Sequence, residues 1–322
     1  MRAAVVRALA LTALAGLAAA AACRPSTPPL TPLVIATGGE GGVYRALGEA
    51  FAATLHDRWG VHATVLTTAA SIENLRLLRV GKADLAFTTV DSADLAMRGQ
   101  PPFSTAVRIS ALAGLYDDYL QIVVRAGASI STVQDLRGRR VSTGAAGSGT
   151  EIVADRVLHA AGLGGEGAIV RSRLSASASG EALRAGRIDA FFFTGGLPTP
   201  AIAELARTVR VRLLSVGSIA ADLQRTYGEV YLARSIPAAT YGMEHEVPTL
   251  AIPNVLVVRS DMPVAEAREV TALLFASKAR LEEVHAQARR LDRRAALATF
   301  PVPLHPGAAR YFRETKVWVS GR

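Results

Sequence analysis

Four loops of this chain combine glycines with hydroxyl side chains, and each falls between an expected strand and an expected helix. They are Thr37–Tyr44, Ala69–Asn74, Gly144–Glu151 and Phe192–Pro198. The N-terminus of a helix presents unpaired backbone N–H groups and a partial positive charge, which together favour an anion. Glycines let the backbone approach a ligand closely, and hydroxyls add further donors. The four loops therefore predict a binding site for a carboxylate, although each loop alone is also compatible with a turn that binds nothing.

None of these loops matches a common nucleotide-binding motif. The first loop contains four glycines, but it lacks the G-x-G-x-x-G spacing of dinucleotide-binding folds and the lysine of a phosphate-binding P-loop. Ser71 in the second loop is also compatible with a simple N-cap. The hydroxyls and N–H groups of the third loop are suited to a carboxylate. These features favour binding of a small organic solute over binding of a nucleotide.

Ser148 in the third loop suggests a nucleophile, and we weighed an enzymatic function on that ground. Position 146 is alanine, so the spacing is not the G-x-S-x-G of hydrolases, and His159 on the following helix has no indicated partner. The compact group Glu244–Glu246 places its carboxylates on the opposite face of a strand from His245, which disfavours a shared metal. We therefore expect no catalysis, no cofactor and no metal, with a serine hydrolase using Ser148 as the less favoured alternative.

The elements that position these loops alternate along the chain. Short runs rich in β-branched residues predict strands, and stretches with apolar residues three to four positions apart predict helices. The expected strands are 33–36, 61–66, 83–89, 119–125, 140–142, 168–173, 188–193, 209–215 and 249–258, and the expected helices are 43–55, 72–80, 149–161, 180–185 and 264–290. Strands that alternate with helices through short loops indicate an α/β fold with a parallel sheet.

Two long apolar runs, at about 119–125 and 249–257, suggest where the chain crosses between two lobes. The first lobe would comprise residues 33–118 plus 258–322, and the second would comprise residues 119–257. Two lobes joined by two crossover strands at a hinge form a clamp that closes on a ligand. Because ligands of open α/β sheets bind beyond the carboxyl ends of the strands, we expect the site in the cleft between the lobes.

The N-terminal residues predict export. Arg2 and Arg7 precede the uncharged run Ala8–Ala22, whose 15 residues are fewer than the roughly 20 that a membrane-spanning helix needs. Residues 1–22 are therefore expected to be a signal peptide. The only cysteine of the chain, Cys23, follows directly, as in a bacterial lipobox, which predicts lipidation and a membrane anchor. Ala20 replaces the branched residue usual in that motif, so simple cleavage of the signal stays open as the alternative.

The segment after the signal and the composition of the body complete this interpretation. Residues 23–32 contain four prolines and predict an extended tether. The net charge of +9 comes mainly from arginines that are scattered along the chain, and aromatic residues make up only 6%. Nucleic-acid binding would need clustered basic residues with interleaved aromatics, so we exclude it. The scattered arginines are compatible with a solvated surface or with a mildly positive field that favours anionic solutes.

Taken in order, several motifs of the chain resemble the TAXI family, the extracytoplasmic solute-binding subunits of tripartite ATP-independent periplasmic (TRAP) transporters. The similarity covers residues 33–315, and its motifs are 37–44, 71–74, 84–91, 135–150, 186–196 and 305–314. It implies a type II periplasmic-binding-protein fold, a ligand such as glutamate, glutamine or a dicarboxylate such as 2-oxoglutarate, and two membrane subunits driven by an ion gradient. A sensor module that reports the same ligand to a signalling partner is the alternative.

The resemblance also implies a ligand shell. The residues at matching positions are Thr37, Gly42, Tyr44, Ser71, Asn74, Ser148, Gly149, Thr150, Thr194 and Gly195. Two departures from the family pattern concern the ligand. The stretch Thr88–Asp91 is less polar than is usual, and Glu40 stands where the family often has serine or threonine. A carboxylate at Glu40 would repel an anionic ligand unless it points away or meets an amine, so an amino acid fits as well as a dicarboxylate.

Overall fold

A ten-stranded mixed sheet runs through residues 32–315, the part of the chain that the computed structural model describes. These residues belong to one compact unit that begins at Pro32. The expected signal peptide, Cys23 and all of the tether except Pro32 lie outside the described residues. The strands are β1 (Leu33–Ala36), β2 (Ala63–Leu66), β3 (Leu85–Thr89), β4 (Ile109–Arg125), β5 (Arg140–Ser142), β6 (Val170–Ser172), β7 (Ala190–Gly195), β8 (Val211–Leu213), β9 (Leu232–Ile236) and β10 (Val247–Arg259).

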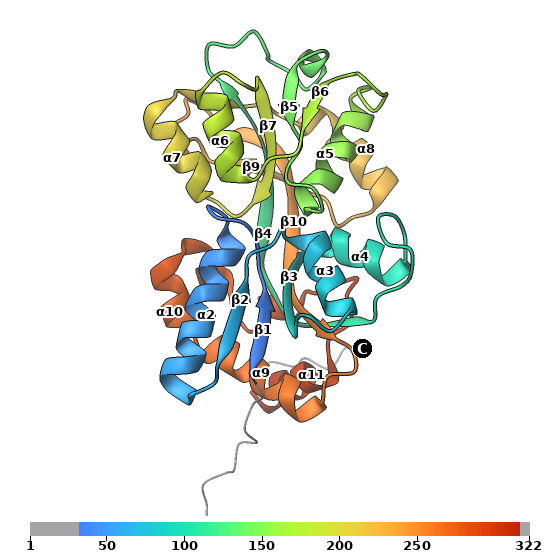
Figure 1. Cartoon of the computed structure of the whole chain (residues 1–322), viewed down its shortest axis with the longest axis vertical. Coiled ribbons are helices and arrows are strands. Elements are labelled where there is room, and N and C mark those ends of the chain that lie inside the picture. The colour runs from blue at the N-terminus through green and yellow to red at the C-terminus, as the bar shows by residue number, and fades with distance from the viewer. Residues whose placement is uncertain (1–31, 316–322) are drawn as a thin grey trace, which may run out of the picture. The chain divides into compact units, whose positions relative to one another are not determined.

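Helices cover this sheet in two groups, which Figure 1 shows above and below its middle. One group consists of α2 (Val43–Trp59), α3 (Ser71–Arg79), α4 (Val90–Arg98), α9 (Val264–Ala276), α10 (Lys278–Val284) and α11 (Pro306–Glu314). The other consists of α5 (Gly149–Ala160), α6 (Ala176–Arg184), α7 (Pro200–Thr208) and α8 (Gly217–Tyr227). Short 3₁₀ turns lie at Gln134–Leu136, Ala238–Thr240, Ala286–Arg290 and Ala295–Leu297.

The long strands β4 and β10 join the two groups. The strand order is β2-β1-β3-β10-β4-β7-β5-β6, with β8 paired to β4 and β9 to β10. β1 pairs with β2 and β3 in parallel, and β5 pairs with β6 and β7 in parallel, whereas β10 is antiparallel to β3 and β4. Along β4 the pairing with β10 extends from Ile109 to Tyr119, and the pairing with β7 begins at Tyr119. The expected two-lobed α/β fold with two crossover strands is therefore confirmed.

Several boundaries differ from the expected ones. β4 begins at Ile109, ten residues before the expected start of the crossover strand. Gly114 and two adjacent aspartates interrupt the apolar pattern there, so the sequence does not indicate a strand. The segment is nevertheless almost fully buried. Residues 264–290 were expected as one helix, but they form α9, α10 and a 3₁₀ turn, with the break at Ser277. Tertiary packing overrides local pattern at both places.

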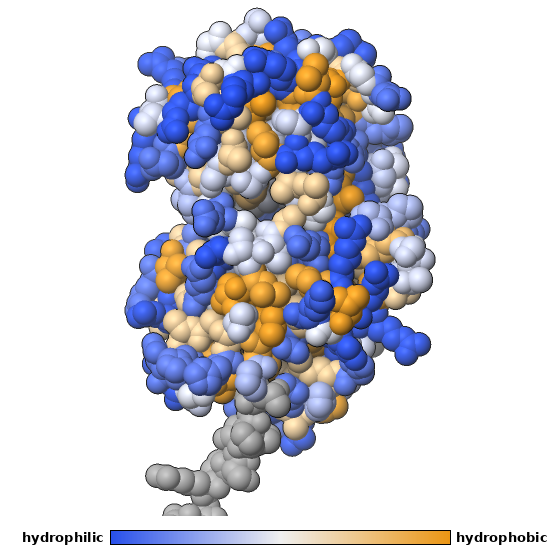
Figure 2. Space-filling view, in the orientation of Figure 1, coloured by the Kyte–Doolittle hydropathy of each residue, from blue (hydrophilic) through white to orange (hydrophobic). Residues whose placement is uncertain are grey.

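Burial on both faces explains why most of the strands have continuous apolar sequences. Residues of β3, β4, β7 and β10 are buried on both faces because helices cover the sheet on each side. The strand β2 is different, because it lies at one edge and its side chains are only half-buried or exposed. Figure 2 shows apolar residues gathered over β1 and β2 on this face and hydrophilic residues over much of the other lobe. Within residues 32–315, no helix combines the length and apolar character needed to cross a membrane.

Candidate ligand-binding cavity

A cavity lies where the N-termini of four helices converge near the middle of β4. The helices are α2, α3, α5 and α6, so two of them come from each lobe. The empty space, including the opening to solvent, is about 700 Å³. The lining consists of Gly38, Gly39, Glu40, Gly42, Val43, Tyr44, Thr68, Ala69, Ala70, Ser71, Thr89, Tyr116, Asp118, Gly144, Ala145, Ser148, Gly149, Thr150, Leu174, Ser175, Ala176, Phe193, Thr194 and Gly195.

Eight of the ten residues in the expected ligand shell line this cavity. They are Gly42, Tyr44, Ser71, Ser148, Gly149, Thr150, Thr194 and Gly195. All four loops singled out in the sequence contribute, although they are up to 150 residues apart along the chain. The structure therefore brings the four loops together around one space.

The other two residues, Thr37 and Asn74, lie behind the cavity wall. The Asn74 side-chain amide donates to the carbonyl oxygens of Thr37 and Phe87, at 2.6 and 2.8 Å. Its oxygen accepts from the Thr68 hydroxyl at 2.6 Å, and the Thr37 hydroxyl donates to the carbonyl of Leu66. Both residues are fully buried, and their side-chain donors bind backbone carbonyls while the Asn74 oxygen binds the Thr68 hydroxyl. They hold the first two loops in position, and neither is exposed to the cavity.

The third loop reaches the cavity through a capped helix start. The Ser148 hydroxyl accepts a hydrogen bond from the N–H of Glu151 at 3.1 Å, and the Glu151 carboxylate accepts one from the N–H of Gly147 at 2.9 Å. This arrangement is a variant of the capping box, in which the carboxylate binds the N–H of the residue before the N-cap, and it fixes the start of α5. No histidine is among the described residues that line the cavity, so Ser148 has no imidazole base within it. The geometry therefore assigns Ser148 a capping role.

The backbone at the starts of α3 and α5 is strained at one position and closely packed at another. Ala70, which precedes α3, has φ 84° and ψ −140°, a conformation that costs a non-glycine residue about 1–3 kcal/mol. A Cβ placed on Gly149 would lie 2.9 Å from the Ser71 hydroxyl oxygen and 3.2 Å from its Cβ. A side chain at position 149 would therefore push against Ser71, where α5 approaches α3 across the two lobes.

Asp118 is the buried acidic residue of the cavity, and the sequence interpretation missed it. It lies on β4 at the crossover and is 4% exposed. Its Oδ2 is 3.5 Å from the hydroxyl of Tyr44, and its Oδ1 has no hydrogen-bond partner among the described residues. Burial raises the pKa of Asp118 to about 7, although the neighbouring Asn254 amide opposes this shift. Burial and the nearby Asp118 also raise the pKa of Tyr44 and of Tyr116 well above their usual value.

Two further buried polar atoms of the lining lack partners among the described residues. They are the Tyr116 hydroxyl and the Thr194 hydroxyl oxygen. Buried polar groups in proteins are nearly always satisfied by protein, water or ligand. None of the described lining residues is lysine or arginine, and the other lining carboxylate, Glu40, is exposed. A ligand here would meet helix N-termini, hydroxyls and one buried carboxyl group.

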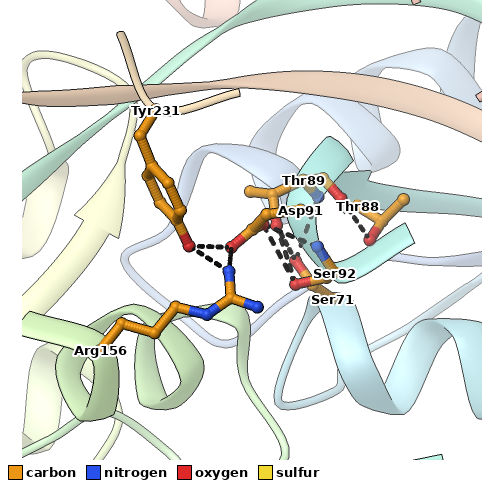
Figure 3. A network of polar contacts seen from close by, with 7 residues as sticks. All are labelled: Ser71, Thr88, Thr89, Asp91, Ser92, Arg156 and Tyr231. Atoms are coloured by element: carbon orange, nitrogen blue, oxygen red, sulfur yellow. Dashed lines mark hydrogen bonds and ion pairs between the residues drawn. The ribbon is translucent and has the colours of Figure 1, made fainter. Parts of the chain in front are cut away.

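A polar network beside the cavity joins the two lobes (Figure 3). The Tyr231 hydroxyl donates to Asp91 Oδ2 at 2.7 Å, and Arg156 Nη1 donates to the Tyr231 hydroxyl and lies 3.4 Å from Asp91 Oδ2. Asp91 belongs to α4 and Arg156 to α5, so the ion pair spans the lobes. On the other side of Asp91, Ser92 and Thr89 connect the network to Ser71 in the cavity wall.

Glu244–Glu246 do not lie on a strand, so the alternation of side chains expected for them does not apply. These residues precede β10 in an irregular segment, and the described residues contain no group of three His, Cys, Asp or Glu side chains that could hold a metal ion.

Comparison with solved structures finds proteins of similar architecture. A protein from Bordetella bronchiseptica RB50 shares the fold, with a TM-score of 0.52, 16% identity, and 91% of each chain covered. The periplasmic aliphatic sulphonate binding protein SsuA from Escherichia coli matches at a TM-score of 0.44 and 18% identity, over 88% of this chain and 83% of that chain. An ancestral arginine-binding protein bound to arginine matches at a TM-score of 0.49 and 16% identity, over 80% of this chain and 98% of that chain. The Bordetella protein therefore shares the two-lobed fold described above.

The family follows from the sequence itself. The pattern of the NMT1-like family matches residues 35–315, which include both lobes and all four loops of the cavity. The chain therefore belongs to the NMT1-like family.

Proposed function

We propose that this protein is an exported solute-binding protein that captures a small carboxylate-bearing solute in the cavity between its lobes. The observation that carries the proposal is the convergence of the N-termini of α2, α3, α5 and α6 on one space whose lining includes buried polar atoms without partners among the described residues. Helix N-termini bind carboxylates through backbone N–H groups and the helix dipole. The ligand shell comprises the eight lining residues that the sequence predicted, with Thr37 and Asn74 as supports behind them.

Capture proceeds by closure of the lobes about β4 and β10. The lobes are residues 33–118 plus 258–322 and residues 119–257, and the hinge lies near Tyr119, where β4 changes partners from β10 to β7. Several contacts cross between the lobes beside the cavity, including the hydrogen bond from the N–H of Glu73 to the carbonyl of Gly147 at 3.1 Å. A ligand that contacts both lobes favours the closed form by no more than its differential affinity for that form.

The transport role completes the proposal. Residues 1–22 direct export to the periplasm or cell surface, Cys23 carries a lipid anchor, and residues 23–32 tether the binding unit to the membrane. The resemblance to the TAXI subunits supports delivery of the solute to a TRAP transporter. Uptake into liposomes that contain the candidate membrane subunits should then require this protein and an ion gradient, and it should not require ATP. Uptake that depends on ATP would contradict delivery to a TRAP transporter.

Calorimetric titration tests solute binding directly. Residues 24–322 would be unfolded and refolded to remove any ligand acquired during expression, then titrated with glutamate, glutamine, 2-oxoglutarate, succinate and an alkanesulfonate. Thr150→Val and Gly195→Ala alter the cavity wall, and Gly165→Ala is the matched control, because a Cβ at Gly165 would meet open space. We expect binding of at least one solute, weakened by the two wall variants and unchanged by the control. Absence of binding by every solute would overturn the proposed function.

A further inference from the structure

The Asp118 side chain is an unusual component for a site that binds an anion. Its carboxyl group is buried, lines the cavity, and has one oxygen without a hydrogen-bond partner among the described residues. The residues around it are Tyr44 from α2, Tyr116 from the same strand and Asn254 from β10, and none of these carries a positive charge. The Asn254 amide is a neighbouring donor, but no cation lies among these neighbours. A buried carboxylate without a cation costs several kcal/mol, so a cationic donor from a ligand would stabilise the ionised form of Asp118.

The geometry around Asp118 indicates which donor fits. The Tyr116 hydroxyl and the Thr194 hydroxyl oxygen also line the cavity and lack partners among the described residues. Together with the Asp118 carboxylate, this phenol and this alcohol give the cavity several acceptor lone pairs. A primary ammonium group carries three donors and one positive charge, whereas a second carboxylate on the ligand would only be repelled.

The lining of the cavity offers partners for charges of both signs. The carboxyl group of Asp118 comes from β4, and the N-termini of α2, α3, α5 and α6 surround the same space. No lysine or arginine is found among the described lining residues. An anionic group of a ligand therefore has helix N-termini as its partners, and a cationic group has Asp118 as its partner.

We infer that the ligand is a zwitterionic amino acid, whose ammonium group is received by Asp118 and whose carboxylate is received by the helix N-termini. This inference rests on the proposed function and narrows its ligand class, because it excludes 2-oxo acids and dicarboxylates without an amine. The exposed Glu40 at the cavity lining does not oppose an amine as it would oppose a second anion.

The protonation of Asp118 supports the same inference. Burial raises the pKa of this carboxyl group to about 7, with Asp117 on the same strand and Asp91 on α4 adding to the shift and with Asn254 and Tyr44 opposing it. A bound ammonium group would hold Asp118 ionised. If only the ionised form binds, affinity below pH 7 should fall about tenfold for each unit of pH.

Matched pairs of ligands test the inference. Each pair consists of an amino acid and the 2-oxo acid of the same skeleton: glutamate and 2-oxoglutarate, glutamine and 2-oxoglutaramate, leucine and 4-methyl-2-oxopentanoate, and alanine and pyruvate. We expect at least one amino acid to bind roughly 100-fold or more tightly than its 2-oxo acid, because a site built for a donor rejects the analogue that lacks it. Asp118→Asn should remove most of that preference.

Asp117→Asn is the control variant. Asp117 is adjacent on β4, is half-buried, and lines a different cavity together with Tyr119 and Arg290. Its replacement should leave the preference for amino acids unchanged, and the melting temperature of each variant would establish that it folds. Equal or tighter binding of the 2-oxo acids, or an unchanged preference in Asp118→Asn, would overturn the inference while the proposed function stands. If no amino acid binds but succinate or an alkanesulfonate does, the inference is likewise overturned and the proposed function stands.

Discussion

Replacing Arg156 by methionine removes the positive charge that faces Asp91 across the two lobes. The Asp91 side chain is 1% exposed and that of Arg156 is 14% exposed, so the pair is largely shielded from water. The guanidinium carbon also lies 4.5 Å from the ring centroid of Tyr227. Methionine keeps most of the side-chain length and the packing on the tyrosine ring, so the change isolates the loss of charge.

The magnitude follows from the geometry of the pair. At the observed 3.4 Å, two unit charges attract by about 5 kcal/mol at an effective dielectric constant of 20. Much of this attraction offsets the desolvation of the two charges. Removal of one partner from a buried pair typically lowers stability by about 3–5 kcal/mol. The Tyr231 hydroxyl and the Ser92 N–H continue to donate to Asp91, at 2.7 Å each. These remaining hydrogen bonds favour the lower end of that range of destabilisation. We expect a loss of about 3 kcal/mol in the free energy of unfolding, and a melting temperature lower by about 6 °C.

A double-mutant cycle measures the interaction itself. Unfolding by urea would be followed for the wild type, Arg156→Met, Asp91→Asn and the double variant, with an expected coupling energy of roughly 2–3 kcal/mol. The matched control is the pair Arg140–Asp189, which is also in direct contact, at 2.6 Å, but is 48% and 26% exposed. Exposed pairs contribute less than about 1 kcal/mol, so that cycle should give a small coupling. A coupling for Asp91 and Arg156 no larger than that of the control would refute the reasoning.

Three further predictions concern the cavity. The pKa of Asp118 is raised from 3.8 to about 7, so the folded state binds more protons than the unfolded state between these pH values. The unliganded protein should therefore lose up to roughly 4 kcal/mol of stability as pH rises through that window. Urea unfolding at several pH values should show this trend, and a trend that persists in Asp118→Asn would argue against it. Ala70→Gly relieves the positive φ at a smaller cost in chain entropy, so it should raise the free energy of unfolding by about 1 kcal/mol, and a destabilised variant would exclude strain at this position. Gly149→Ala forces a Cβ against Ser71 in the closed form, so calorimetry should show ligand affinity reduced by about tenfold, and unchanged affinity would mean that the lobes need not approach this closely.

Local pattern in the sequence was enough to locate most of the cavity wall. Each of the four loops falls between a strand and a helix, and parallel strands bring such loops to one edge of a sheet. The same reasoning could not separate Asn74, which binds backbone behind the wall, from Ser71, which lines the cavity three residues earlier. Both residues belong to α3 and both are almost fully buried. The packing of α3 against β3 and the first loop decides which of them faces the ligand.

Asp118 shows what only the tertiary structure decided. Two adjacent aspartates at the start of the crossover indicate that one points to each face of the strand, since side chains alternate. The pairing of β4 with β10, including the register shift near Pro253, determines that Asp118 faces the cavity and Asp117 the opposite side. The contact of Asp91 with Arg156 likewise joins residues 65 positions apart. Sequence pattern therefore determines which loops can bind a solute, because that depends on local backbone chemistry. The charge that lines the cavity depends on Asp118, which reaches the cavity only through the pairing of β4 with β10.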